Sequence, residues 1–232
     1  MKLSLASVVV AAVGLSGGAY ATSYNLGDLV RTGGSITIGD KIFDDFGFSS
    51  SSFNPSDAVV TPTVDGAGVY YLSFAGPWVA IGGTETVSLE YSIGTTSGQR
   101  LISSIDQSFV LSALGTAGNI TVSETANNGS PTGPTLGQTT LSFVAGTTPA
   151  LDLEDPVAES GDDLLIEGAS SKLFILTSLL LEADRAGLVG ASTITQSFHQ
   201  IRPGIAVNES GTTAALMGAG LLGLGYLRRR TA

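Results

Sequence analysis

The stretch that decides the fold is TETVSLEYSI, residues 84–93. Apolar and polar residues alternate there, and a β-strand points every second side chain toward the same face. The apolar face carries Val87, Leu89, Tyr91 and Ile93. This pattern predicts a strand with one face in the core and the other in solvent.

Similar short segments, separated by Gly, Pro, Asn and Ser, occur along most of the chain. They lie at residues 35–38, 41–48, 69–74, 78–81, 101–111, 119–125, 139–144, 173–181 and 194–201. No helical period of useful length appears between the two ends of the chain. Strands at this spacing predict an all-β fold, with an antiparallel β-sandwich or jelly-roll-like body over residues 22–206.

Two turns and one internal similarity make this prediction more specific. Gly76-Pro77 favours a turn between two short strands, and residues 127–137, rich in Gly, Pro and Asn, favour a loop. Residues 104–109, SIDQSF, are similar to residues 193–198, TITQSF. Two matches of six residues indicate similar strands in one sheet rather than a repeat protein.

The composition excludes several kinds of active site. The 232 residues contain no cysteine, so the chain has no disulfide, no Cys-ligated zinc and no thiol nucleophile. His199 is the single histidine, and its alternating surroundings favour a strand residue with a satisfied hydrogen bond. The GxSxG, P-loop, HExxH and EF-hand motifs are absent. We therefore expect a protein that is not an enzyme.

The N-terminal end has the pattern of a secretory signal peptide. Lys2 precedes an apolar run, and Ala19-Tyr20-Ala21 has the small residues of a cleavage site. Residues 1–21 are therefore predicted to be a signal peptide that directs export.

The C-terminal end has the pattern of a short membrane helix. Residues 212–227, TTAALMGAGLLGLGYL, carry no charge, and Arg228, Arg229 and Arg230 follow directly. Sixteen helical residues span about 24 Å, close to the ~30 Å hydrocarbon core of a bilayer. Arginines at the end of such a helix favour a cytoplasmic C-terminus. A buried core helix is the alternative, and three consecutive arginines fit it poorly.

The body of the chain, between the two terminal segments, is strongly acidic. The terminal segments hold Lys2 and the three arginines but no acidic residue, so six basic and twenty acidic residues give the body a formal net charge of −14. Such a charge disfavours nucleic acid as a partner.

One acidic cluster has two interpretations. Seven carboxylates fall within residues 152–167. They could converge on Ca²⁺, which binds six to eight oxygens in flexible loops; the candidate ligands are Asp152, Glu154, Asp155, Asp162 and Asp163. The alternative is a solvated acidic loop, because no EF-hand spacing is present. No other cofactor is expected.

The two ends together resemble those of bacterial PEP-CTERM proteins, the presumed substrates of exosortase. In that family a Val-Pro-Glu-Pro-like motif precedes an apolar helix rich in Gly and Leu, and an arginine cluster ends the chain. Residues 216–230, LMGAGLLGLGYLRRR, match the helix and the cluster, and residues 33–43, GGSITIGDKIF, are similar to the bodies of family members. The sorting motif departs from the family pattern, because it keeps the valine and the glutamate but has neither proline: Val207, Asn208, Glu209 and Ser210.

The resemblance implies a destination rather than an activity. Residues 207–232 would form the sorting segment, and an exosortase-like enzyme would process it. The chain would attach transiently to the inner membrane and finally reach the cell surface or extracellular matrix of a Gram-negative bacterium.

Three functions are open at this point. The first is a non-catalytic surface or matrix protein associated with exopolysaccharide or biofilm. The second is a secreted carbohydrate-binding module, for which Trp78, Tyr70 and Tyr71 are the only aromatic cluster, although the core could use them equally well. The third is a secreted hydrolase with two distant carboxylates, for which no particular pair stands out.

Overall fold

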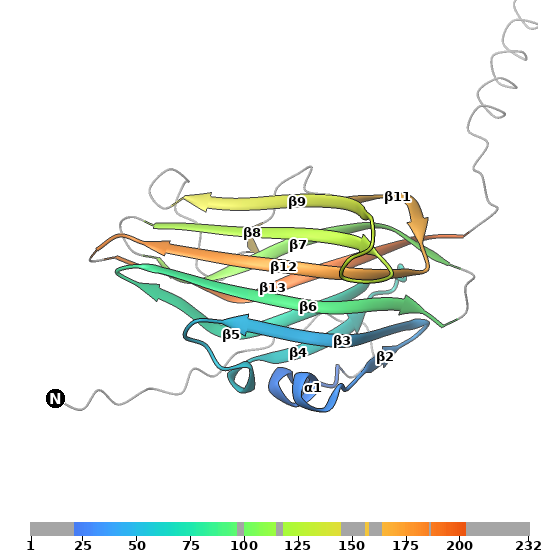
Figure 1. The fold of residues 1–232 in the computed structure, drawn as a ribbon, viewed down its shortest axis with the longest axis horizontal. Helices are drawn as coiled ribbons and strands as arrows, with labels where there is room; N and C mark the ends of the chain where they lie inside the picture. Colours follow the sequence, from blue (N-terminus) through green and yellow to red (C-terminus); the bar gives the residue numbers. More distant parts are fainter. Residues whose placement is uncertain are drawn as a thin grey trace, which may run out of the picture.

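The chain folds into two antiparallel β-sheets that lie face to face (Figure 1). This computed structural model describes residues 21–96, 100–114, 118–144, 156–157, 164–185 and 187–202. Sheet A consists, in spatial order, of β1 (Tyr24–Asn25), β4 (Val59–Val64), β5 (Tyr70–Ile81), β13 (Leu188–Ile201), β7 (Leu101–Leu114) and β10 (Pro156–Val157), with β11 (Leu164–Ser170) also paired to β7. Sheet B consists of β2 (Ile36–Ile38), β3 (Lys41–Ser50), β6 (Thr84–Thr95), β12 (Lys172–Ala183), β8 (Gly118–Asn128) and β9 (Thr135–Val144).

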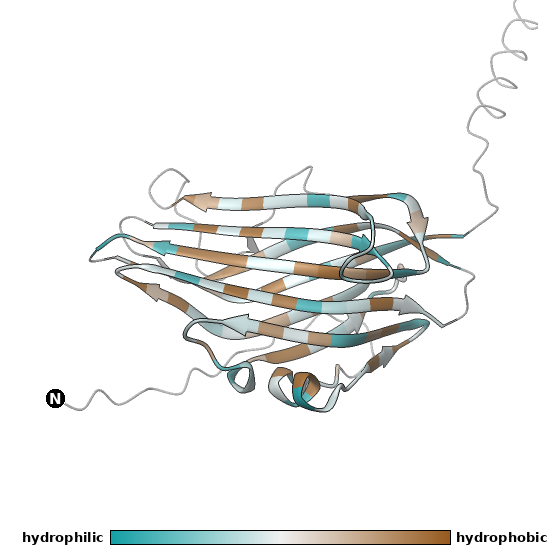
Figure 2. Ribbon diagram, viewed as in Figure 1, coloured by the Kyte–Doolittle hydropathy of each residue, from teal (hydrophilic) through white to brown (hydrophobic). Residues whose placement is uncertain are grey.

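The predicted sandwich is therefore confirmed, and the strand that decided it lies inside sheet B. The side chains of Val87, Leu89, Tyr91 and Ile93 on β6 are all buried. Figure 2 shows apolar and polar bands alternating along the strands of both sheets. Each sheet thus contributes one apolar face to a shared core, as period-two spacing requires.

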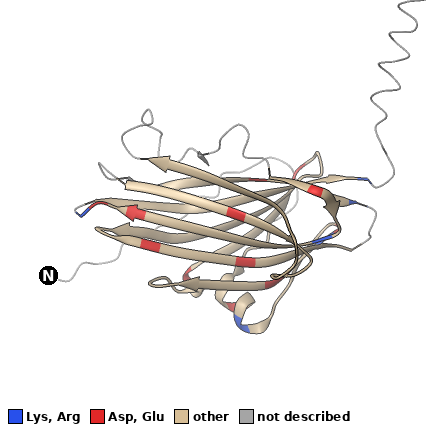
Figure 3. Cartoon of the chain, turned by 45° about the horizontal axis from the view of Figure 1, so that its top comes forward, with Lys and Arg blue, Asp and Glu red and all other residues tan. Residues whose placement is uncertain are grey.

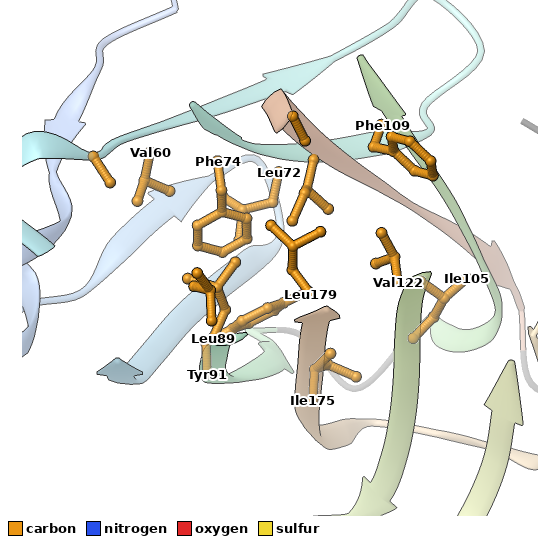
Figure 4. Packing of buried hydrophobic residues seen from close by; sticks show 14 of the residues in the cluster. Val60, Leu72, Phe74, Leu89, Tyr91, Ile105, Phe109, Val122, Ile175 and Leu179 are labelled. Atoms are coloured by element: carbon orange, nitrogen blue, oxygen red, sulfur yellow. The ribbon is translucent and has the colours of Figure 1, made fainter. Parts of the chain in front are cut away.

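The core between the sheets is packed by branched aliphatic and aromatic side chains (Figure 4). At one end of it, the rings of Phe43 on β3 and Phe198 on β13 meet at 5.6 Å between centroids, nearly edge to face. Tyr91 lies 5.6 Å from Phe74 on sheet A and 6.4 Å from Phe198. These edge-to-face and tilted contacts join the two sheets through their largest apolar side chains.

Residues 173–181 form a buried strand, as predicted. They lie in β12, which pairs with β6 on one side and β8 on the other. A central strand with an apolar neighbour on each side explains the almost continuous run of Leu, Ile and Phe.

The predicted turn at Gly76-Pro77 is wrong, because β5 continues through both residues. Ala75 pairs with Thr193 and Trp78 with Ala191, so two residues of β5 lie opposite one residue of β13. This is a β-bulge, and β4 pairs with β5 only as far as Ala75. Proline is tolerated there because a bulge beyond the end of the neighbouring strand needs no ladder N–H.

The predicted loop at residues 127–137 is shorter than expected. β8 extends to Asn128 and β9 begins at Thr135. Asn127 closes the hairpin between them, since its amide donates to the Pro131 carbonyl at 3.1 Å and accepts from Thr135 Oγ1 at 2.9 Å.

A short helix, α1 (Leu26–Thr32), lies where none was expected. Asn25 caps its start by accepting from the Asp28 N–H, and Gly33 ends it in the left-handed conformation at φ 62°. Leu26 and Leu29 bury one side of the helix. Two turns are too short to produce a helical period in the sequence. A single 3₁₀ turn, η1 (Pro55–Asp57), packs against α1.

The two similar segments are neighbours in sheet A, as predicted. β7 and β13 pair antiparallel, and Gln107 lies opposite Gln196 at the centre of the two segments. Because the strands run in opposite directions, the similar sequences place an apolar residue opposite an apolar one and a polar residue opposite a polar one.

The predicted signal peptide, apart from Ala21, and the predicted membrane helix lie outside the described residues. Among the residues that are described, no helix is long and apolar enough to cross a membrane.

Candidate functional site

The outer face of sheet A carries polar side chains in regular rows. One row crosses four neighbouring strands through positions that lie directly opposite one another: Thr63 on β4, Tyr71 on β5, Ser197 on β13 and Asp106 on β7. The next row contains Thr61, Ser73, Thr195 and Ser108. Neighbouring strands are about 4.8 Å apart, so these rows form a continuous polar surface.

Asp106 is the centre of a hydrogen-bonded cluster in this surface. Its Oδ2 accepts from Ser197 Oγ at 3.0 Å and lies 2.6 Å from His199 Nε2. Ser197 Oγ is also 3.3 Å from the same ring nitrogen. His199 is thus a strand histidine with a satisfied hydrogen bond, as predicted.

This cluster does not have the geometry of a catalytic triad. In a triad the serine and the carboxylate contact different nitrogens of the histidine, so that one nitrogen accepts the serine proton while the carboxylate orients the ring through the other. Here both groups contact Nε2. The arrangement holds a carboxylate, a hydroxyl and an imidazole in fixed positions, which suits binding rather than nucleophilic attack.

Tyr71 is the aromatic residue of this face, and its ring is held in place at the edge of the cluster. Its hydroxyl donates to Asp65 Oδ2 at 3.0 Å. Asp65 also accepts from the backbone N–H groups of Ala67 and Val69, each at 2.9 Å. The hydrogen bond from Val69, together with those from Tyr71 and Ala67, lowers the pKa of Asp65. Partial burial and the neighbouring Asp65 raise the pKa of Tyr71, so the phenol stays neutral.

The three aromatic residues of the sequence analysis do not form one surface. Tyr70 and Tyr71 are consecutive in β5 and therefore point to opposite faces of sheet A. Tyr70 and Trp78 are buried in the core, and Tyr71 alone is partly exposed.

The outer face of sheet B is also rich in hydroxyl groups. One row crosses all five of its longer strands: Ser49, Ser88, Ser178, Ser123 and Thr140. Ser123 and Thr140 are 3.3 Å apart, oxygen to oxygen, and belong to this network. Figure 3 shows charged residues only at scattered positions on the strands. This face has no partly exposed aromatic side chain comparable to Tyr71 among the described residues.

A second polar group lies between the sheets, where the sequence predicted only core. The Tyr91 hydroxyl donates to Gln196 Oε1, and Gln196 Nε2 donates to Glu124 Oε2 and, at 2.7 Å, to Thr177 Oγ1. All four side chains are buried. Burial, followed by the proximity of Glu124, raises the pKa of Tyr91 well above its usual value.

The residues predicted for sorting and for calcium lie outside the described part of the chain. They are Val207, Asn208, Glu209, Ser210, Arg228, Arg229 and Arg230 for sorting, and Asp152, Glu154, Asp155, Asp162 and Asp163 for calcium. Glu167, the last carboxylate of the acidic cluster, is exposed on β11. Within the described residues, no group of three or more acidic or histidine side chains could hold a metal ion.

Asp106 and Ser197 belong to the candidate site but cannot be identified from the sequence alone. The available signal was the similarity of residues 104–109 and 193–198, because both residues occupy the outward positions of these segments. Recognising them required the antiparallel register, which only the structure supplies.

Comparisons with known proteins add little to this geometry. Neither the scan against protein-family models nor the search of curated proteins found a match. Among solved structures, TmCBM61 in complex with beta-1,4-galactotriose aligns with 68% of this chain and 88% of that chain, at 10% sequence identity and a TM-score of 0.31. A TM-score this low does not establish a common fold.

Proposed function

We propose that the chain is an exported, non-catalytic protein of the bacterial cell surface or extracellular matrix, delivered through its C-terminal tail. The observation that carries this proposal is the charge-free segment at residues 212–227, closed by three arginines. The signal-peptide pattern of residues 1–21 supports export, and the absence of cysteine and of catalytic motifs agrees with a structural or binding role.

Cell fractionation and reporter fusions test this proposal. A reporter joined after Ala232 is expected to be cytoplasmic, because the arginines hold the C-terminus inside. Mass spectrometry of protein released from the cells is expected to show a chain that begins at Thr22 and ends near residues 207–210. Released protein that still ends at Ala232 contradicts processing, and a periplasmic reporter contradicts the orientation.

A second function is supported by the outer face of sheet A, namely binding of a neutral polysaccharide. The row of Tyr71, Ser197 and Asp106 offers an aromatic ring beside fixed hydrogen-bonding groups. The C–H face of a sugar ring packs on an aromatic ring, while its hydroxyls donate to carboxylates and exchange hydrogen bonds with serine and threonine. The formal charge of −14 on the body repels acidic polysaccharides, which favours an uncharged ligand.

Binding of the full chain to a glycan array tests the ligand class. Neutral glucans, galactans and mannans are expected to be retained, and acidic polymers such as alginate are expected to be excluded at low salt. Retention of acidic polymers in preference to neutral ones contradicts this function, and so does an array without any retained glycan.

A further inference from the structure

Lys41 and Gln200 meet between the sheets at the end of the core. The contact of Phe43 with Phe198 brings β3 and β13 together, and two residues further along each strand lie Lys41 and Gln200. Lys41 Nζ is 3.0 Å from Gln200 Oε1. The two residues are 159 positions apart in the chain and belong to opposite sheets.

A turn and a tyrosine position the lysine. Gly39 has φ 55° and lies so close to Tyr70 that a Cβ at this position would be 2.3 Å from the tyrosine hydroxyl. The turn therefore presents Asp40 and Lys41 directly against Tyr70, with Lys41 Nζ 5.0 Å from the centre of the Tyr70 ring. The Lys41 side chain has no exposed surface.

The surroundings of Lys41 make its ammonium group easier to deprotonate than that of an exposed lysine. Burial lowers the pKa of Lys41, and the nearby Arg100 lowers it further, although Asp40 opposes the shift. Asp40 Oδ1 lies 2.7 Å from Nζ and can accept its proton. Burial tends to raise the pKa of Asp40, but hydrogen bonds with Lys41 and Tyr70 lower it overall, so the carboxylate is ionised and has an oxygen free of a proton next to Nζ.

Only the oxygen of the Gln200 side-chain amide makes a hydrogen bond among the described residues. Its Oε1 accepts from Lys41, whereas its Nε2 is buried and has no hydrogen-bond partner among the described residues. Thr95, directly opposite Lys41 in the ladder, likewise has a buried hydroxyl without a partner among these residues. A buried amine thus meets an amide and a carboxylate that are only partly exposed, with spare hydrogen-bonding capacity beside them.

We propose that Lys41 and Gln200 join spontaneously in an isopeptide bond that links the two sheets covalently. Asp40 takes a proton from the Lys41 ammonium, and the neutral amine attacks Gln200 Cδ to form the new C–N bond. The bond from Cδ to Nε2 then breaks as Asp40 returns the proton to the leaving nitrogen, and the attacking nitrogen gives its second proton to the departing ammonia. One lysine ammonium and one glutamine amide give one secondary amide and one ammonium ion, so no oxidant or other reactant is needed.

Such a bond would do for this chain what a disulfide does in other exported proteins. The sequence has no cysteine with which to form one. The bond would close a loop of most of the body and fix β3 of sheet B to β13 of sheet A, which reduces the entropy of the unfolded chain.

Peptide mapping of the purified full chain tests this proposal. Trypsin is expected to leave the chain uncut after Lys41, and a branched peptide is expected that contains both Lys41 and Gln200 and lacks the mass of one ammonia. Intact mass alone does not decide, because Asn128-Gly129 can lose ammonia by closing a succinimide. Recovery of Lys41 and Gln200 in separate, unmodified peptides, after prolonged incubation of the folded protein at neutral and mildly alkaline pH, overturns the proposal.

Variants identify the reacting groups. Lys41→Arg and Gln200→Leu are each expected to abolish the branched peptide, and Asp40→Asn is expected to slow its formation on the order of 100-fold. The matched control is Lys172→Arg, since Lys172 also lies near carboxylates, at 3.6 Å from Asp45 and 4.0 Å from Asp44, but is exposed. A branched peptide that persists in Lys41→Arg, or disappears in Lys172→Arg, contradicts the assignment. The peptide map of the parent chain is enough to show whether the bond exists. The proposal can therefore be tested even if one of the variants fails to fold.

Discussion

The Tyr91 hydroxyl, on β6 in the interior of one sheet, donates a hydrogen bond to Gln196 on β13 in the interior of the other. Both side chains are fully buried. Polar contacts across a sandwich core are directional, whereas apolar packing is not, so this contact fixes how the two sheets face each other. Gln196 also donates hydrogen bonds to Glu124 and Thr177. It is therefore the residue that connects the other three side chains of the network.

Replacing Gln196 with leucine is therefore expected to destabilise the fold despite the apolar surroundings. Leucine cannot make the hydrogen bonds that Gln196 makes with Tyr91, Glu124 and Thr177. Losing hydrogen bonds inside the core lowers the free energy of unfolding. We expect the free energy of unfolding to fall by about 2–4 kcal/mol, measured by urea denaturation. Unchanged stability of Gln196→Leu contradicts the network.

Replacing Leu89 with alanine tests the apolar side of the same core. Leu89 is 1% exposed and faces sheet A, so the shorter side chain leaves a cavity. A loss of about 2–5 kcal/mol is expected. Ser88→Ala, one residue away on the outer face, is the control and is expected to change the unfolding free energy by less than about 0.5 kcal/mol. Equal effects of the two changes would mean that the faces of β6 are assigned incorrectly.

Stability is also expected to depend on pH in the alkaline range. Burial, followed by the nearby Glu124, raises the pKa of Tyr91 in the folded state well above its ordinary value of 10.0. Folding therefore favours the protonated phenol, and the stability this contributes is complete below pH 10 and is lost as the pH rises above that value. Tyr91→Phe is expected to show a flatter fall of the melting temperature above this pH than the parent. Parallel curves for parent and variant would contradict the assignment.

Calcium binding by the acidic segment at residues 152–167 stays a prediction. We expect millimolar Ca²⁺ to leave the melting temperature of the full chain unchanged, because solvated carboxylates in a loop are screened by water and salt. A specific calcium site would instead raise the melting temperature. It would also lose this effect in the Asp162→Asn/Asp163→Asn variant, and that result would establish the calcium interpretation.

The sequence predicted what depends on period-two spacing and missed what depends on register. The alternation in residues 84–93 and the apolar run at residues 173–181 were enough to place β6 and β12 in a sandwich. Gly76-Pro77 was misinterpreted because a bulge and a turn use the same residues, and only the neighbouring strands distinguish them. The helix α1 was missed because two turns bury too few residues to show a period.

The candidate sites depend still more on tertiary structure. Asp106 and His199 lie 93 residues apart, and Lys41 and Gln200 lie 159 residues apart. No local pattern connects either pair, since each pair forms only when strands distant in the chain become neighbours or face each other. The same limit explains why Tyr70 and Tyr71, adjacent in sequence, could not be assigned separately to the core and the surface before the faces of β5 were known.

The most direct test of the account is calorimetric titration of the full chain with the neutral polysaccharide that binds best on the array. The variant Tyr71→Ala/Asp106→Asn alters the outer face of sheet A, and Ser88→Ala/Ser123→Ala alters the outer face of sheet B as the matched control. The first variant is expected to bind at least about tenfold more weakly than the parent, because it removes both the aromatic ring and the carboxylate charge. The second is expected to bind like the parent. Undiminished binding by the first variant, with circular dichroism showing that it is folded, would contradict the assignment of this face.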